Sequence, residues 1–301
     1  MNGGWYRGDC HVHTERSHAA DLTAARVMSA AREAGLDFIA ITEHNTAATG
    51  YRDSELLVIP GQEVVTRNGH WVAVGLSPGQ VVDWDGPIER AVEPVRRVGG
   101  LCIAAHPHAP YPSGTLEHAV RHFDLVEAWN GAWRSEVPWQ ADNEAALAEW
   151  GRGLAADIRA GAWRPAIGNS DAHLEGQIGT PQTVVLASEL SPAAVLAGLR
   201  AGRSWIAESA SVELSFTAHA GDRSAEIGER LRVEAVVARV EVDGVPDAVV
   251  SFHTERGRAH SERAHEIEWP TTAGESGFIR IEVRHPGGAM AALTNPIILG
   301  G

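Results

Sequence analysis

The sequence predicts an α/β fold over its first two-thirds, followed by a smaller all-β unit. The chain has 301 residues, 44% of them hydrophobic, which is enough for one large core and a second, smaller one. Up to about residue 208, strand-like and helix-like segments alternate, as is typical of a parallel sheet or an α/β barrel. After residue 209, short strand-like segments follow one another with turn residues between them and without a helical pattern. We therefore expect two domains, residues 1–208 and 209–301, the second a small antiparallel β-sandwich.

Hydrophobic periodicity and turn residues define the elements in order. Strands of the first domain are expected at residues 5–12, 38–42, 57–60, 70–75, 101–105, 125–128, 166–168 and 183–187. Helices are expected at residues 23–34, 88–98, 116–122, 141–160 and 192–201. The third and fourth strands flank the turn Arg67-Asn68-Gly69, so we expect them to pair across it. Strands of the second domain are expected at residues 212–217, 231–240, 248–252, 266–269, 278–284 and 290–294.

Charge and composition exclude several function classes. The net charge of −14 argues against a broad nucleic-acid-binding face, because phosphate backbones need clustered cations. No apolar run approaches the roughly 18 residues of a membrane helix, and the N-terminus lacks a secretory signal. The two cysteines form no CxxC pair, so a reducing cytoplasm is the expected location. We expect a small, anionic substrate as the partner, no membrane contact, and leave homo-oligomerisation open.

The chain contains no lysine, since all 25 basic residues are arginines. This excludes mechanisms built on a Schiff-base lysine, a P-loop lysine or a carboxylated lysine that bridges two metals.

Six predicted strands carry His, Glu or Asp just beyond their carboxyl ends. In chain order these segments are His11-Val12-His13, Thr42-Glu43-His44-Asn45, Gly61-Gln62-Glu63, Ala104-Ala105-His106-Pro107-His108, Glu127-Ala128-Trp129-Asn130 and Asn169-Ser170-Asp171-Ala172-His173. With 15 histidines in the chain, one HxH arises by chance, so the first segment alone is weak evidence. The shared placement is stronger, because the active site of an α/β barrel lies at that rim and such groups bind divalent metals. The alternative is a set of separate solvated loops.

Together these motifs resemble the polymerase and histidinol phosphatase (PHP) family of metallohydrolases, in family order over residues 1 to roughly 208. The resemblance implies a distorted seven-stranded (β/α) barrel with two or three divalent metal ions, which could be zinc, manganese or iron. Residues 202–208 and 292–296 are similar to the carbaryl-hydrolase-like branch, which appends a small β-domain. The amidohydrolases share the HxH opening, but their bridging carboxylated lysine cannot form here.

The resemblance also implies a ligand set, position by position. The first metal's ligands would be His11, His13, Glu63 and Asp171, with Glu63 bridging to the second metal. His106 matches a second-metal ligand, and where better-known members have another histidine this chain offers Glu127 or Asn130. The positions that hold a third metal in trinuclear members are His18, His44 and His173.

The expected mechanism is hydrolysis by a metal-bridged hydroxide. Two metals about 3.5–4 Å apart lower the pKa of a hydroxide between them, and Asp171 would hold it. His108 and His173 are candidates to protonate the leaving group. Arg134 is a candidate anion clamp, with a solvated loop arginine as the alternative, and Arg16 is the other cation near the motifs.

Other side chains have structural interpretations. Trp129, Trp133 and Trp139 could form an aromatic wall for a substrate, but core or lid packing is favoured. Cys10 and Cys102 are expected to be buried thiols, Cys10 pointing away from the metals. For His70, a structural role is favoured over a hydrogen bond to a metal ligand.

Three functions follow from these features. Hydrolysis of a small phosphomonoester or phosphodiester is favoured by the resemblance. Hydrolysis of a carboxylic or carbamic ester on the same metal centre is the first alternative, and a non-catalytic metal-binding protein is the second. A phosphate pocket should contain several cations or donors, whereas an aryl-ester pocket should be mostly apolar.

Overall fold

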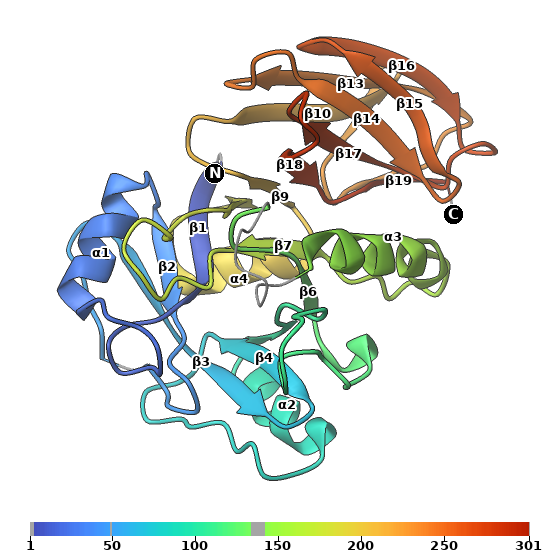
Figure 1. The fold of residues 1–301 in the computed structure, drawn as a ribbon. Coiled ribbons are helices and arrows are strands. Elements are labelled where there is room, and N and C mark those ends of the chain that lie inside the picture. The colour runs from blue at the N-terminus through green and yellow to red at the C-terminus, as the bar shows by residue number, and fades with distance from the viewer. Residues whose placement is uncertain (1–2, 49, 134–141, 301) are drawn as a thin grey trace.

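The structure is a computed structural model that describes residues 3–48, 50–133 and 142–300. Figure 1 shows an α/β part, coloured blue to yellow, and an all-β part, coloured orange to red, that lies above α3. The elements of the α/β part are β1 (Gly4–Val12), α1 (Ala24–Glu33), β2 (Phe38–Ile41), β3 (Leu57–Thr66), β4 (Gly69–Val74), α2 (Ile88–Arg97), β5 (Leu101–Ala104), the 3-10 helix η1 (Val120–His122), β6 (Leu125–Asn130), α3 (Asn143–Arg159), β7 (Ala166–Asn169), β8 (Gln182–Ala187), α4 (Pro192–Arg200) and β9 (Ser204–Ala207).

The strands of this part form one mixed sheet in the order β9-β8-β1-β2-β3-β4-β5-β6-β7. Parallel pairs join β1, β2 and β3 and, separately, β5, β6 and β7, whereas β4 runs antiparallel to both of its neighbours. The expected pairing of β3 and β4 across the turn is therefore confirmed. The sheet as a whole is mixed, and not the parallel sheet that the strand–helix alternation indicated. The sequence also underestimated two strands, since β3 extends beyond Glu63 to Thr66 and β6 extends beyond residue 128 to Asn130. The helix expected at residues 116–122 is reduced to the three residues of η1.

Side-chain hydrogen bonds hold β7, which ends this strand order, beside β1 and β8. Asn169 Oδ1 accepts from the backbone amide of Cys10 at 2.8 Å. Thr183 Oγ1 on β8 donates to Gly168 O at 2.7 Å and accepts from Gly168 N at 3.0 Å. The sheet thus curves back on itself, and the carboxyl ends of β1 and β7 lie next to each other.

Local sequence signals explain where the helices begin. Thr23 caps α1 by accepting from the amide of Arg26, and Asp142 caps α3 by accepting from that of Ala145. Ser191 caps α4, whose first residue is Pro192. No helix in the described ranges is long and apolar enough to cross a membrane.

The C-terminal part consists of strands that surround a second core. They are β10 (Glu213–Ala220), β11 (Arg223–Glu226), β12 (Arg230–Leu231), β13 (Ala235–Asp243), β14 (Val249–Thr254), β15 (Gly257–Arg263), β16 (Glu266–Thr272), β17 (Phe278–Arg284), β18 (Met290–Thr294) and β19 (Ile297–Leu299). The four-stranded sheet β11-β10-β13-β16 contributes Phe216 and Val240 to this core, and β14 and β17 contribute Phe252 and Ile281. The main sheet also enters this part, because β18 pairs with β9.

Candidate metal centre

Strand geometry brings the two histidines of the HxH segment to one side of β1. His11 and His13 alternate with Cys10 and Val12, which point into the apolar core. All four side chains are buried, and the two imidazole centroids lie 5.1 Å apart. The expectation that Cys10 is a buried thiol facing away from the site is confirmed.

Four donors form the first group, the buried His11, His13 and Glu63 and the half-buried Asp171. The Nε2 atom of His11 lies 3.5 Å from Glu63 Oε2 and 3.3 Å from Asp171 Oδ1. The corresponding distances from His13 Nε2 are 3.5 and 3.1 Å. Donor atoms that share one tetrahedral ion at about 2.1 Å lie about 3.4 Å apart, so this spacing fits a divalent metal. His11 Nε2 and Glu63 Oε2 are moreover buried without a hydrogen-bond partner among the described residues, as expected of metal-facing atoms.

The outer nitrogens of these imidazoles are held by protein acceptors. His11 Nδ1 donates to Glu127 Oε1 at 3.2 Å. His13 Nδ1 donates to the hydroxyl of Ser17 at 3.2 Å, and that hydroxyl donates to Glu43 at 2.5 Å. Such bonds fix the tautomer and direct Nε2 toward the metal position.

Glu127 lies behind the donors rather than among them. Its Oε1 accepts from His11 Nδ1 and, at 2.7 Å, from Asn169 Nδ2. Its Oε2 accepts from the backbone amide of His106 at 2.7 Å and from Asn130 Nδ2 at 2.9 Å. With both oxygens occupied, Glu127 supports His11 and His106, and it lies in none of the donor groups of the described chain.

A second group joins His13, His44 and His173, whose ring centroids lie 4.3 to 5.4 Å apart. His173 Nδ1 donates to the carbonyl of Asp171 at 2.8 Å, which leaves its Nε2 available. The structure does not bring His18 to this group, because its side chain is exposed in the loop after β1. His13 instead belongs to both this group and the first.

A third group contains a residue that the sequence did not single out as a ligand. Glu63 Oε1 lies 2.9 Å from His70 Nδ1 and 3.3 Å from His106 Nε2. The register of the hairpin pairs Val65 with His70, which places Glu63 and His70 on the same face. The predicted turn therefore already indicated that His70 lies near Glu63. To recognise His70 as a possible ligand, however, one needs the exact pairing of β3 and β4.

The centre concentrates negative charge in a buried volume. Burial opposes ionisation of Glu63 and Asp171, yet His11 and the other nearby histidines outweigh it and lower the pKa of both carboxyls. Burial lowers the pKa of His13 to about 4, whereas the surrounding carboxylates raise the pKa of His11 against burial. Glu127 adds a third buried carboxylate with a lowered pKa. Buried charges of one sign need a cation, which this donor set can bind.

Two of the donor residues have strained backbones, and a buried acid holds the loop that carries one of them. His106 and Asp171 adopt left-handed backbone angles, with φ of 25° and 51°, at a cost of about 1–3 kcal/mol each. Asp9 accepts from the amides of Ser170 and Gly179 at 3.1 Å each, which ties the Asp171 loop to β1. Burial raises the pKa of Asp9 to about 6, although these hydrogen bonds oppose the shift.

Several other predicted site residues lie elsewhere. His108 Nε2 lies 2.5 Å from Glu149 Oε2 on α3, and Arg16 stacks on the ring of Tyr51. Trp129 is buried in the core beside Trp133, in agreement with the packing interpretation. Arg134 and Trp139 lie outside the described residues.

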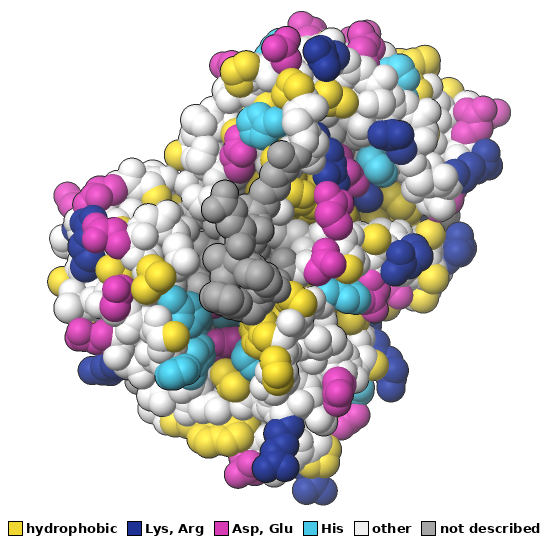
Figure 2. All heavy atoms as spheres, viewed as in Figure 1, with side chains coloured by type: hydrophobic (Ala, Val, Ile, Leu, Met, Phe, Trp, Pro, Cys, Tyr) yellow, Lys and Arg dark blue, Asp and Glu magenta, His cyan; other side chains and the backbone are white. Residues whose placement is uncertain are grey.

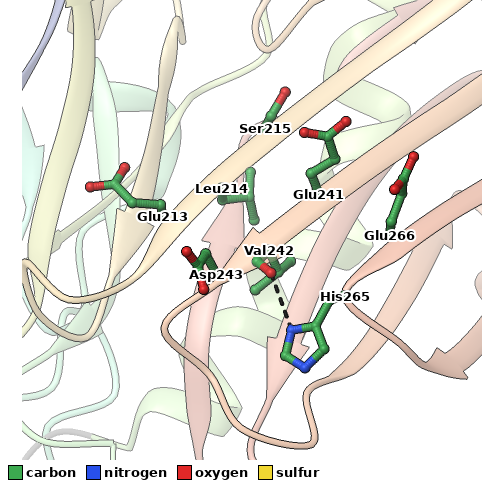
Figure 3. Close-up of a pocket in the computed structure, with 8 residues that line it drawn as sticks. All are labelled: Glu213, Leu214, Ser215, Glu241, Val242, Asp243, His265 and Glu266. Atoms are coloured by element: carbon green, nitrogen blue, oxygen red, sulfur yellow. Dashed lines mark hydrogen bonds between the residues drawn. The ribbon is translucent and has the colours of Figure 1, made fainter.

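The surface of the molecule has two hollows of interest. Figure 2 shows histidine side chains gathered around the first, with an acidic side chain at its floor. The second, of about 480 Å³, lies on the C-terminal sheet formed by β10, β13 and β16. Figure 3 shows carboxylates of Glu213, Glu241 and Glu266 around it and His265 Nδ1 directed at the carbonyl of Val242, 3.2 Å away. These carboxylates are exposed to solvent, so we assign no chemistry to this hollow.

Comparison with known proteins gives matches to sequence and to solved structures. An uncharacterized protein of Methanocaldococcus jannaschii is 27% identical in a match 151 residues long, which covers 44% of this chain and 85% of that protein. A two-domain protein of Bacteroides vulgatus containing a predicted PHP-like metal-dependent phosphoesterase is 15% identical, with a TM-score of 0.49, over 98% of this chain and 96% of that one. A lesion-specific endonuclease of Pyrococcus furiosus is 14% identical, with a TM-score of 0.45, over 66% and 56% of the two chains.

One family model matches the chain. It describes the PHP-associated family and matches residues 154–204, which include Asp171 and His173. None of these matches tests the carbaryl-hydrolase-like branch, which stays a prediction. The match over residues 154–204 confirms the resemblance of this chain to the PHP family that its motifs indicated.

Proposed function

We propose that this protein is a metal-dependent hydrolase of small phosphoesters, with a metal centre built from residues 1–208 and a β-domain at residues 209–301. The observation that carries the proposal is the first donor group, in which two imidazole nitrogens and two carboxylate oxygens lie at the spacing of a single coordination sphere. A metal ion bound there would polarise an ester oxygen and lower the pKa of a water molecule. The PHP resemblance favours phosphoesters as the substrate.

The chain's own residues have separable tasks in this proposal. His11 and His13 hold an ion through Nε2, since their Nδ1 atoms are engaged by Glu127 and Ser17. Asp171 is the one first-group donor that is partly accessible, with 19% of its side chain exposed. We assign to it the additional task of accepting a proton at its carboxylate from the attacking water.

Hydrolysis of a carboxylic or carbamic ester is the second candidate. It is favoured by the aromatic side chain of Tyr111, whose ring lies 6.1 Å from that of His70 and 6.0 Å from that of His106. An apolar wall of this kind suits an aryl or alkyl ester better than a dianionic phosphate.

A comparative rate assay tests the proposal. Protein loaded with manganese or zinc is assayed with p-nitrophenyl phosphate, bis-p-nitrophenyl phosphate and p-nitrophenyl acetate, with Asp171→Asn as the background. Release from a phosphoester that Asp171→Asn abolishes supports the proposal. Release from the acetate alone identifies the second candidate, and no release from any of the three leaves a metal-binding protein without this activity.

A further inference from the structure

Besides the place of His18, the donor groups differ from the resemblance at the third ligand of the second metal. The resemblance leads to β6 for that ligand, where this chain has Glu127 or Asn130. We propose instead that the second metal ion is bound by Glu63, His70 and His106, so that β4 supplies the ligand that β6 lacks. This assignment rests on the proposed function, because it concerns the second ion of the same centre.

The spacing of the three donor atoms supports the assignment. Glu63 Oε1 lies 2.9 Å from His70 Nδ1 and 3.3 Å from His106 Nε2, and all three atoms lie within 4.8 Å of one another. These values approach the separation of about 3.4 Å expected for donors around one tetrahedral zinc. Glu63 Oε2, in contrast, lies 3.5 Å from the Nε2 atoms of His11 and His13 and 3.0 Å from that of His44. The two oxygens of Glu63 are thus divided between the two groups, as a bridging carboxylate requires.

The hairpin fixes His70 in this position. Glu63 pairs with Val72 and Val65 pairs with His70, so the two donors lie diagonally on one face of β3 and β4. Gly69, which precedes His70, has a φ of +98°, and a Cβ atom there would lie 2.5 Å from the backbone of Leu116. Only glycine fits at this position, where Gly69 pairs with Thr66 at the end of the hairpin.

The carboxylate of Glu127 on β6 is already committed. Both oxygens of Glu127 accept hydrogen bonds, from four donors in all. Asn130 Nδ2 donates to Glu127 at 2.9 Å and lies 3.4 Å from Asp171 Oδ2. For Glu127 to bind a metal, the amide of His106 and the imidazole of His11 would lose their acceptor.

The surroundings of His70 are those of a buried ligand. Its side chain is 11% exposed, that of His106 is 2% exposed, and their rings lie 5.1 Å apart. The ring of Tyr111 packs near both, and it lies against Gly114, where a Cβ atom would come within 2.2 Å of the ring. A metal ion at this position would be shielded from bulk water on the Tyr111 side.

Metal content tests the assignment without reference to activity. Tag-free wild-type protein and its variants are stripped with EDTA, equilibrated with excess zinc or manganese, and the equivalents per chain are measured by mass spectrometry. His70→Asn is the decisive variant, because asparagine can still donate a hydrogen bond to Glu63 but is a poor ligand for these metals. The matched control is His219→Asn, at an exposed position on β10.

We expect at least two equivalents in the wild type and in His219→Asn, and one fewer in His70→Asn. Glu127→Gln should keep the wild-type number when metal is in excess. The assignment is overturned if His70→Asn keeps the wild-type number, if Glu127→Gln loses the equivalent instead, or if the wild type binds fewer than two.

A crystal structure of the metal-loaded wild type tests the assignment even if a variant fails to fold. Anomalous scattering should place an ion about 2.0–2.2 Å from donor atoms of Glu63, His70 and His106. An ion bound by His106 and a β6 residue, with His70 outside the coordination sphere, overturns the assignment. If the metals bind as expected but no ester is hydrolysed, the proposed function fails and this assignment stands. If the protein hydrolyses an ester but His70→Asn keeps the wild-type metal content, the proposed function stands and this assignment fails.

Discussion

Asn295 forms a pair of hydrogen bonds with the backbone of Ala166, its Oδ1 accepting from the amide at 2.8 Å and its Nδ2 donating to the carbonyl at 3.0 Å. Asn295 follows β18, and Ala166 begins β7, the strand that leads to Asp171. The same Nδ2 lies 3.0 Å from the carbonyl of Ser204 on β9. A single buried amide therefore ties the C-terminal part of the chain to a strand of the metal centre.

We expect Asn295→Ala to lower the free energy of unfolding by about 3 kcal/mol, because it removes the side-chain partner of both the amide and the carbonyl of the buried Ala166. Chemical denaturation of the metal-free protein measures this loss. Ser215→Ala, at an exposed position on β10, is the control and should change the free energy by less than about 0.5 kcal/mol. Equal effects of the two substitutions would show that Asn295 has no such role.

The second prediction concerns the support of His11. In Glu127→Gln, one carboxylate oxygen becomes an NH2 group, which faces either His11 Nδ1 and Asn169 Nδ2 or the donors of His106 and Asn130. Either arrangement sets donor against donor, so we expect the first site to lose metal affinity about 10- to 100-fold.

Competition with a chromophoric chelator measures that affinity. The control His219→Asn, which changes an exposed residue, should bind metal with the wild-type affinity in the same titration. A Glu127→Gln protein that binds its first ion as tightly as the wild type would contradict the supporting role.

Much of the site was predictable from the sequence because its strands are short apolar runs that end in polar motifs. The α/β order and the convergence of His11, His13 and Asp171 follow from that pattern. The position of Glu63 within β3 did not, because a buried carboxylate interrupts the apolar run that marks a strand. His70 was not assigned as a ligand because its role depends on strand register, which a residue pattern does not specify.

In the C-terminal part, too, some strands were predictable from the sequence and others were not. The bounds of β17 and β18 agree with the prediction, since β17 alternates apolar and charged residues and β18 is an apolar run, and both strands are buried. In contrast, β15 was not predicted, because it is an exposed edge strand with polar residues on both faces. The loop arginine Arg134, predicted as an anion clamp, lies outside the described residues.

Metal binding should also stabilise the fold. A ligand that binds only the folded state at a hundredfold its Kd adds about 2.7 kcal/mol to the free energy of unfolding. We expect zinc or manganese to raise the melting temperature of EDTA-stripped protein. In His11→Ala and Asp171→Asn, which each remove a first-group donor, the increase should shrink, whereas His219→Asn should keep it. An increase of the same size in all four proteins would mean that the ions bind elsewhere.

The last prediction is a pH dependence of stability that arises away from the metal centre, at His253 on β14. Burial and then Arg280 lower the pKa of His253 to about 4, and Arg258 and Arg284 add to this effect. Glu282 opposes it, at 3.4 Å from His253 Nε2. His253 lines a groove between β14, β17 and α3, and on its α3 side this groove presents two further charged groups, Glu144 and Arg152. Folding therefore keeps His253 neutral where the unfolded chain would be protonated.

The sign follows from the two pKa values. Above pH 6.5 His253 is neutral in both states and has no effect. As the pH falls from 6.5 to about 4, the unfolded state binds a proton that the folded state does not, so stability decreases. The loss reaches at most about 3 kcal/mol. His253→Gln removes this difference, so the variant should gain stability relative to the wild type as the pH is lowered through this range. Denaturation of both EDTA-stripped proteins between pH 7 and pH 4 measures the gain, with His219→Gln as the control. A difference between variant and wild type that does not change with pH would mean that His253 titrates alike in the folded and unfolded chains.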